Sequence, residues 1–125
     1  VIWFHTEDRK TKPNSELKIF IETGMPLDAV ACYNDEIAFG VYQTLTELGI
    51  NVPEDISITG FDDSYLAANC PVRITTAKHP KEKLGEAAAE LMLELLEDKN
   101  YLSNPRKRIF IPELVIGESC IERNK

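Results

Sequence analysis

The chain has 125 residues, of which 43% are hydrophobic, enough for one compact domain with a core of ordinary size. Its 14 Lys and Arg residues against 21 Asp and Glu residues give a formal net charge of −7, and its one uninterrupted basic run, at 106–108, is short. These values exclude an extensive nucleic-acid surface within the chain, so we expect any DNA contact to lie outside it.

The cysteines and the apolar runs indicate the cellular setting. Cys32, Cys70 and Cys120 form no close pair and are odd in number, which favours reduced thiols in a cytosolic protein over a disulfide framework. No apolar run is long enough to span a bilayer, and no secretory signal segment is apparent. Because the chain opens on Val1 inside an apolar run, we expect a piece of a longer protein.

The first predicted elements in chain order are a strand, a helix and a second strand. Residues 1–4 are apolar and strand-like, and polar residues that include Glu7 follow where the strand would end. A helix is predicted over 16–22, with Ser15 as its N-cap. Residues 29–33 form a short apolar run, which is typical of a strand buried on both faces.

The next residues predict a helix followed by a strand parallel to the one at 29–33. Four apolar side chains recur at helical spacing and form a predicted core stripe: Ile37, Val41, Leu45 and Leu48. Gly49 follows as a helix terminator, and 56–61 has the apolar pattern of another buried strand. A helix between two such strands makes a βαβ unit.

The remaining elements complete an α/β pattern. Residues 64–71 are too mixed to assign, and 72–77 alternates like a strand. The run 81–98 carries the strongest helix signal, with a wide apolar stripe that must be covered, either by the chain's own lobe or, as we favour, by a second copy of the chain. Strands are predicted at 108–111 and 114–116. Alternating strands and helices predict an α/β sandwich with a mainly parallel sheet.

Four polar residues directly follow the two parallel strands. In an open parallel sheet, ligands bind outside the carboxyl ends of the strands, so Asn34 and Asp35, and then Asp62 and Asp63, are the leading candidates for a site. A purely structural alternative exists for each. Asn34 or Asp35 could cap the following helix, which we favour for Asp35, and the other two acids could belong to an ordinary turn.

Four ordered motifs resemble a known family. The segments DAVACYNDEIAFGV, LGINVPEDISITGFDD, RITTAKHPKEKLGEAAAELMLELL and IPELVIGES resemble the effector-binding domain of LacI/GalR-type bacterial repressors. Within that group, KHPKEKLG is most similar to the L-arabinose-responsive repressors, which carry a GntR-type winged helix. The resemblance implies a three-layer sandwich, equivalent to one lobe, plus a crossover segment, of a type I periplasmic-binding-protein-like fold.

The resemblance also implies a domain plan and a function. Residues 1–78 and 113–125 would form the second lobe of a sugar sensor, 79–112 would belong to the first lobe, and the DNA-binding domain is absent from the chain. A small sugar, L-arabinose by the narrower resemblance, would bind between the lobes and control DNA binding by the separate domain. We expect a cytoplasmic protein with no membrane contact and no cofactor.

The family's ligand roles carry over at matching positions only. Asn34 resembles the asparagine that hydrogen-bonds sugar hydroxyls, and Asp62 resembles the carboxylate that accepts from them. His79 stands where many relatives have a glutamine, which is a departure, and a structural loop histidine is an equally good interpretation. Glu7 is a weaker candidate for the same site.

An interface is expected on the helix that follows Asn34. Phe39 and Tyr42 lie off its core stripe, and large aromatic side chains on an outer helix face often mark a contact surface. Related repressors pair through this helix and the segment after GFDD, which adds Tyr65 and Leu66. A twofold-symmetric homodimer is therefore predicted.

Two other classes of function have less support in the sequence. Asp35, Asp62 and His79 could form an acid–base set, or the acids a phosphoacceptor site, but the chain has no nucleophile elbow, P-loop or GxGxxG motif. The histidines and cysteines are too scattered for a metal site. A non-enzymatic sensor is the better account, with a periplasmic sugar-binding protein of a transporter as the alternative.

Overall fold

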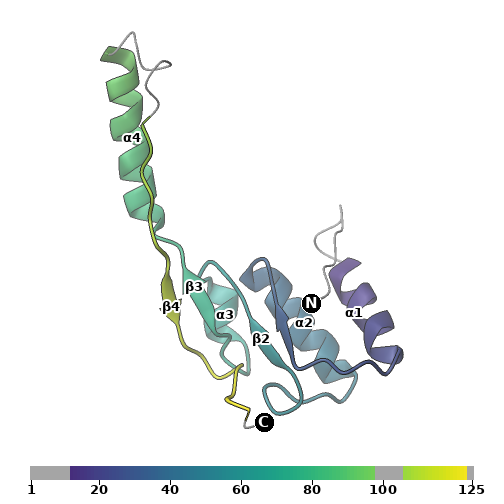
Figure 1. Cartoon of the computed structure of the whole chain (residues 1–125). Coiled ribbons are helices and arrows are strands. Elements are labelled where there is room, and N and C mark those ends of the chain that lie inside the picture. Colours follow the sequence, from purple (N-terminus) through teal and green to yellow (C-terminus); the bar gives the residue numbers. More distant parts are fainter. Residues whose placement is uncertain (1–11, 98–105, 124–125) are drawn as a thin grey trace. The chain divides into compact units, whose positions relative to one another are not determined.

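A computed structural model describes residues 12–97 and 106–123 of the chain (Figure 1). The described residues divide into two compact units, 12–78 with 114–123, and 79–113. The elements in chain order are α1 (Lys12–Glu22), β1 (Ala29–Ala31), α2 (Asp35–Glu47), β2 (Ser57–Thr59), α3 (Tyr65–Asn69), β3 (Thr76–Lys78), α4 (Lys81–Glu97) and β4 (Glu113–Val115). The predicted strand at 1–4 lies outside the described residues.

The sheet of the first unit is parallel where β1 meets β2. Ala29 pairs with Ser57 and Ala31 with Thr59. A parallel bridge from Thr59 to Thr75 continues the pairing toward β3, which pairs with β4. Helices between successive strands confirm the predicted α/β class. In β1, however, Ala29 and Ala31 are exposed, so this strand is not buried on both faces within the described chain.

The core of the first unit lies between α2 and the sheet. Ala38, Val41 and Leu45 of α2 are buried together with Ile58 and Ile74. The helices α1 and α3 each pack against α2. The predicted core stripe of α2 was correct at Val41 and Leu45.

Two end positions of that stripe differ from the prediction. Ile37, in the first turn of α2, is half-buried, and Leu48, its C-cap residue, is 40% exposed, so the stripe is buried only in the middle of the helix. Gly49 ends the helix as predicted, with a φ of +73° that residues other than glycine rarely adopt.

The segment 117–120 closes the seam between β2 and β3. The Ser119 side chain is fully buried; its Oγ donates to the Ile58 carbonyl at 2.6 Å and accepts from the Thr75 N–H at 2.9 Å. The Ile58 N–H in turn donates to the Ser119 carbonyl at 2.8 Å. One serine therefore satisfies a carbonyl of β2 and the N–H of the residue that directly precedes β3.

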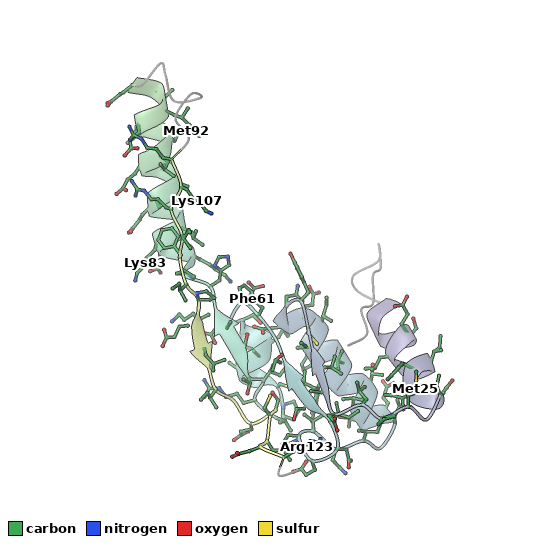
Figure 2. All side chains as sticks on the ribbon, in the orientation of Figure 1. Met25, Phe61, Lys83, Met92, Lys107 and Arg123 are labelled. Carbon is green, nitrogen blue, oxygen red and sulfur yellow. The ribbon has the colours of Figure 1, made fainter. Side chains whose placement is uncertain are left out.

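Neighbouring residues hold this segment in place. Gly117 lies so close to the chain before β3 that a Cβ would meet the Arg73 carbonyl oxygen at 2.4 Å. Arg123, labelled in Figure 2, donates to the carbonyls of Glu54, at 3.2 Å, and Asp55. The segment is thus fastened on both sides of Ser119.

The second unit is α4 and the extended segment that runs beside it (Figure 1). Arg106 pairs with Glu94, and Arg108 pairs with Glu90 and Glu94. Of the predicted stripe on α4, Ala87 is buried and Leu84 and Leu91 are half-buried. Other large apolar side chains of this unit stay exposed, namely Met92, Leu93, Leu95, Leu96, Ile109 and Ile111.

Two local predictions were wrong, and one stretch without a prediction contains a helix. Ser15 lies inside α1, which begins three residues earlier at Lys12, so it is not the N-cap. The unassigned stretch 64–71 contains the short helix α3, with Ser64 as its N-cap residue. The predicted strand at 108–111 is extended but forms no ladder with described residues, because a strand needs a partner strand.

Candidate functional site

The backbones after β1 and β2 stay side by side beyond the ends of the strands. The Cys32 N–H donates to the Thr59 carbonyl and the Asp35 N–H to the Phe61 carbonyl, both at 2.9 Å. Phe61, labelled in Figure 2, therefore lies on the same sheet edge as the residues that begin α2. The predicted candidates Asn34, Asp35, Asp62 and Asp63 meet at this carboxyl edge, as the parallel topology requires.

Asp35 is the organising residue of the edge. Its side chain is 1% exposed, and both carboxylate oxygens are engaged. Oδ1 accepts from the Thr76 hydroxyl and Oδ2 from the Ser64 N–H, each at 2.6 Å. Gly60 packs directly against it, since a Cβ there would meet Oδ1 at 2.2 Å. One buried carboxylate thus ties the start of α2 to β3 and to the loop after β2.

The loop held by Asp35 has a strained backbone. Asp62 has a φ of +106° and Asp63 a φ of +49°, and a residue other than glycine adopts such values at a cost of about 1–3 kcal/mol. The Asp62 N–H donates to the Ala77 carbonyl at 2.9 Å, which adds a second restraint. Two adjacent strained acids held by buried hydrogen bonds are typical of a functional loop.

The helix cap that the sequence favoured at Asp35 lies one residue earlier, at Asn34. Asn34 is the N-cap of α2, and its Oδ1 accepts from the Ile37 N–H at 2.9 Å. Asp35 is instead the first helical residue, and its carboxylate turns into the interior. The cap engages the Asn34 oxygen, so the amide N–H groups are what this side chain can offer a ligand as donors.

The other predicted site residues are distributed as follows. His79 belongs to the second unit, where it is half-buried and its carbonyl accepts from the Lys81 N–H at 2.8 Å. Glu7 lies outside the described residues. Tyr33, which the sequence assigned to the buried strand, is 72% exposed and directly precedes Asn34. Its position, as an aromatic residue at the end of the apolar run, was the signal that could have indicated an exposed side chain at the sheet edge.

The expected interface residues differ in their exposure. Phe39 and Tyr42 are half-buried and pack against the core, so they are less external than the helical pattern suggested. Leu66 is also half-buried, whereas Tyr65 is 79% exposed. Tyr42 also lines a groove of about 260 Å³ with the 49–54 turn, at the amino end of β2.

Cys32 lies beneath the edge, three residues before Asp35. Burial, together with the negative charge of Asp35, raises the pKa of the Cys32 thiol to about 12. The thiol is therefore neutral at physiological pH and unsuited to act as a nucleophile. Cys32, Cys70 and Cys120 are all unbridged.

Residues 12–97 and 106–123 contain neither a metal-binding cluster nor a membrane-spanning helix. No cluster of three or more His, Cys, Asp or Glu side chains in these ranges could hold a metal ion. None of the helices in the same ranges has the length and apolar character needed to cross a membrane.

Comparison with known proteins gives consistent matches. Residues 3–120 match the model of the periplasmic binding protein-like domain. The arabinose metabolism transcriptional repressor of Halalkalibacterium halodurans is 34% identical over 98% of this chain and 34% of its own length. The HTH-type transcriptional repressor PurR of Vibrio vulnificus is 40% identical over 77% of this chain and 28% of its own length.

A solved structure with a similar fold also belongs to a protein described as a transcriptional regulator. A putative transcriptional regulator of the LacI family from Sanguibacter keddieii is 26% identical, with a TM-score of 0.77 over 95% of this chain and 43% of that chain. The chain spans about a third of the length of the curated relatives it matches. The fold is thus that of one lobe of a type I periplasmic-binding-protein-like architecture, as the sequence predicted.

Proposed function

The chain belongs to the periplasmic binding protein-like domain family, and on that premise we propose that it is the effector-sensing part of a transcriptional repressor. A small sugar binds at the carboxyl edge of the first unit and alters DNA binding by a domain outside this chain. The observation that carries the proposal is the strained Asp62–Asp63 loop, held by buried Asp35. The names of the relatives, which are transcriptional repressors and not enzymes, support it.

The chemistry of the edge suits a polyhydroxylated ligand. The Asp62 carboxylate accepts hydrogen bonds from sugar hydroxyls, and the Asn34 amide donates to them. His79 and Glu7 remain additional candidates from the resemblance. A sugar that binds one arrangement of the lobes better than another shifts the population toward it, and the DNA-binding domain responds to that shift.

L-Arabinose is the sugar we propose. Two relatives named arabinose metabolism transcriptional repressors are 34% and 35% identical over 98% and 95% of this chain, which supports the choice. In the proposed two-lobed protein, residues 79–112 belong to the first lobe, so the 125-residue chain alone should bind sugar poorly.

Calorimetric titration of the full-length protein with L-arabinose tests the proposal. Asp62→Ala should weaken binding by about 1.5–3 kcal/mol, the usual scale for a hydrogen bond to a charged group. Asp28→Ala is the matched control, because its side chain is 84% exposed before the amino end of β1. Unchanged affinity in Asp62→Ala would remove this residue from the site. A wild-type protein that binds no sugar would overturn the proposed function.

We also propose a homodimer through Phe39, Tyr42, Tyr65 and Leu66. The exposed ring of Tyr65 supports this surface. Because Phe39 and Tyr42 pack on the core, glutamate substitutions there would also disturb folding, and Tyr65→Glu is the cleaner test. Sedimentation velocity should show dissociation of a dimeric parent, and an unchanged dimer would exclude this surface.

The remaining partners follow from the same proposal. The protein contacts operator DNA through the separate domain only, works in the cytoplasm and needs no membrane contact. The alternative, a periplasmic sugar-binding protein of a transporter, is not favoured, because the relatives are named as transcriptional repressors. Fluorescence anisotropy with operator DNA separates the two, since only a repressor releases or binds DNA in response to sugar.

A further inference from the structure

Tyr33 is an exposed aromatic residue at the edge that the proposed function assigns to the ligand. It follows β1, directly precedes the helix cap Asn34, and is 72% exposed. The neighbouring residues on either side, Cys32 and Asn34, are half-buried. A large aromatic side chain that remains outside the core beside polar groups is a feature of binding surfaces.

Backbone hydrogen bonds on either side of Tyr33 place it beside the chain that leads into the acidic loop. Ala31 pairs with Thr59, and the Cys32 N–H donates to the Thr59 carbonyl; the next bond comes from Asp35, so Tyr33 and Asn34 lie between two bonds to the neighbouring backbone. The hydrogen bond from the Asp35 N–H to the Phe61 carbonyl, 2.9 Å, shows that the two backbones are still adjacent there. The backbone position of Tyr33 is therefore on the same edge as the strained loop.

A sugar presents two kinds of surface, and the edge offers a partner for each. Hydroxyl groups need acceptors and donors, which Asp62 and Asn34 supply. The C–H face of the ring is apolar and slightly positive, and it suits the negative face of an aromatic side chain. Asn34 and Asp62 have no apolar group to contact the C–H face, whereas Tyr33 offers its aromatic ring.

We propose that Tyr33 is a specificity-determining residue of the sugar site, with its ring packed against the apolar C–H face of an aldopentose. The inference rests on the proposed function and adds a residue to it. The C–H face of a sugar changes with the orientation of each hydroxyl, so a stacked ring distinguishes L-arabinose from its C4 epimer D-xylose. Asn34 and Asp62 bind the hydroxyl groups, and Tyr33 contributes to the affinity and provides part of the selectivity.

Calorimetry on the full-length protein with both sugars tests this role. Tyr33→Ala should raise the Kd for L-arabinose about tenfold and move the ratio of the two Kd values toward one. Tyr33→Phe keeps the ring and should stay within about threefold of the wild type. Met25→Ala is the control, because Met25 is also large and exposed, at 51%, but lies before the amino end of β1 (Figure 2).

The outcomes separate this inference from the proposed function. If the wild type binds neither sugar, the proposed function fails first. If the wild type binds L-arabinose and Tyr33→Ala leaves both Kd values unchanged, Tyr33 has no part in the site although the sensor function stands. Equal weakening by Tyr33→Ala and Tyr33→Phe would replace stacking with a hydrogen bond from the phenol, and it would overturn the stacking assignment. Circular dichroism of each variant confirms that the fold is retained.

Discussion

Substitution of Asp35 gives the sharpest test of how the loop after β2 is held. Asp35→Asn keeps the shape of the side chain but replaces two charged acceptor oxygens with one neutral acceptor and one NH₂ donor. The amide oxygen can therefore accept from the Ser64 N–H or from the Thr76 hydroxyl, which now donate to the carboxylate at 2.6 Å each, but not from both. Losing one of these hydrogen bonds to a charged group costs about 1–3 kcal/mol. Asp35→Ala removes both acceptors, and two hydrogen bonds to a charged group predict a loss of about 3–6 kcal/mol.

Urea unfolding followed by circular dichroism measures these losses. Glu36→Gln is the matched control, because Glu36 is the next residue in the same helical turn and is exposed, so its effect should be below about 0.5 kcal/mol. Asp35→Asn should also weaken sugar binding in the full-length protein, since the strained acids would relax. If Asp35→Asn matched Glu36→Gln in stability, the carboxylate would not be the group that holds the loop.

Three further predictions concern the interior of the first unit. Ser119→Ala should lower the free energy of unfolding in urea by about 1–3 kcal/mol, because the Ser119 hydroxyl bonds to β2 and to the residue before β3. Ser64→Ala is the control and should be nearly neutral, because the buried Ser64 Oγ has no hydrogen-bond partner among the described residues. Gly117→Ala should lower the melting temperature, because the added Cβ would meet the backbone before β3 at 2.4 Å, and an unchanged melting temperature would contradict that contact. Burial, and to a lesser degree the charge of Asp35, raises the pKa of the Cys32 thiol from 9.0 to about 12 in the folded state. Stability should therefore fall as the pH rises from 9 toward 12, and in unfolding titrations Asp35→Asn should make this fall end at a lower pH.

Much of the fold was predictable because its signals are local. The apolar spacing in α2 and the terminator Gly49 are contained within 15 residues, and they set the helix almost to its ends. The strand predicted at 108–111 had an equally regular pattern, yet a strand exists only where another backbone accepts and donates its hydrogen bonds. That partner is not encoded in the strand's own residues.

The site was predictable in place but not in detail. Parallel topology brings Asn34 and Asp62 to one edge whatever the side chains do. Which of two adjacent polar residues caps α2, however, depends on a shift of one residue in the helix start. The partners of Asp35 are 29 and 41 residues away in the sequence, at Ser64 and Thr76, so its buried role depends on tertiary contacts that no local pattern contains.

The hydrogen bonds between Ser119 and β2 can form only late in the synthesis of the chain. Ser119 bonds to Ile58 from 61 residues further along the chain, so β2 leaves the ribosome long before the group that satisfies its backbone. At ~5–20 residues per second, that interval is about 3–12 s. During it, the nascent first unit exposes an incomplete sheet edge, which is a template for pairing with other chains. Aggregation through this edge is therefore possible until residues 117–120 have been synthesised.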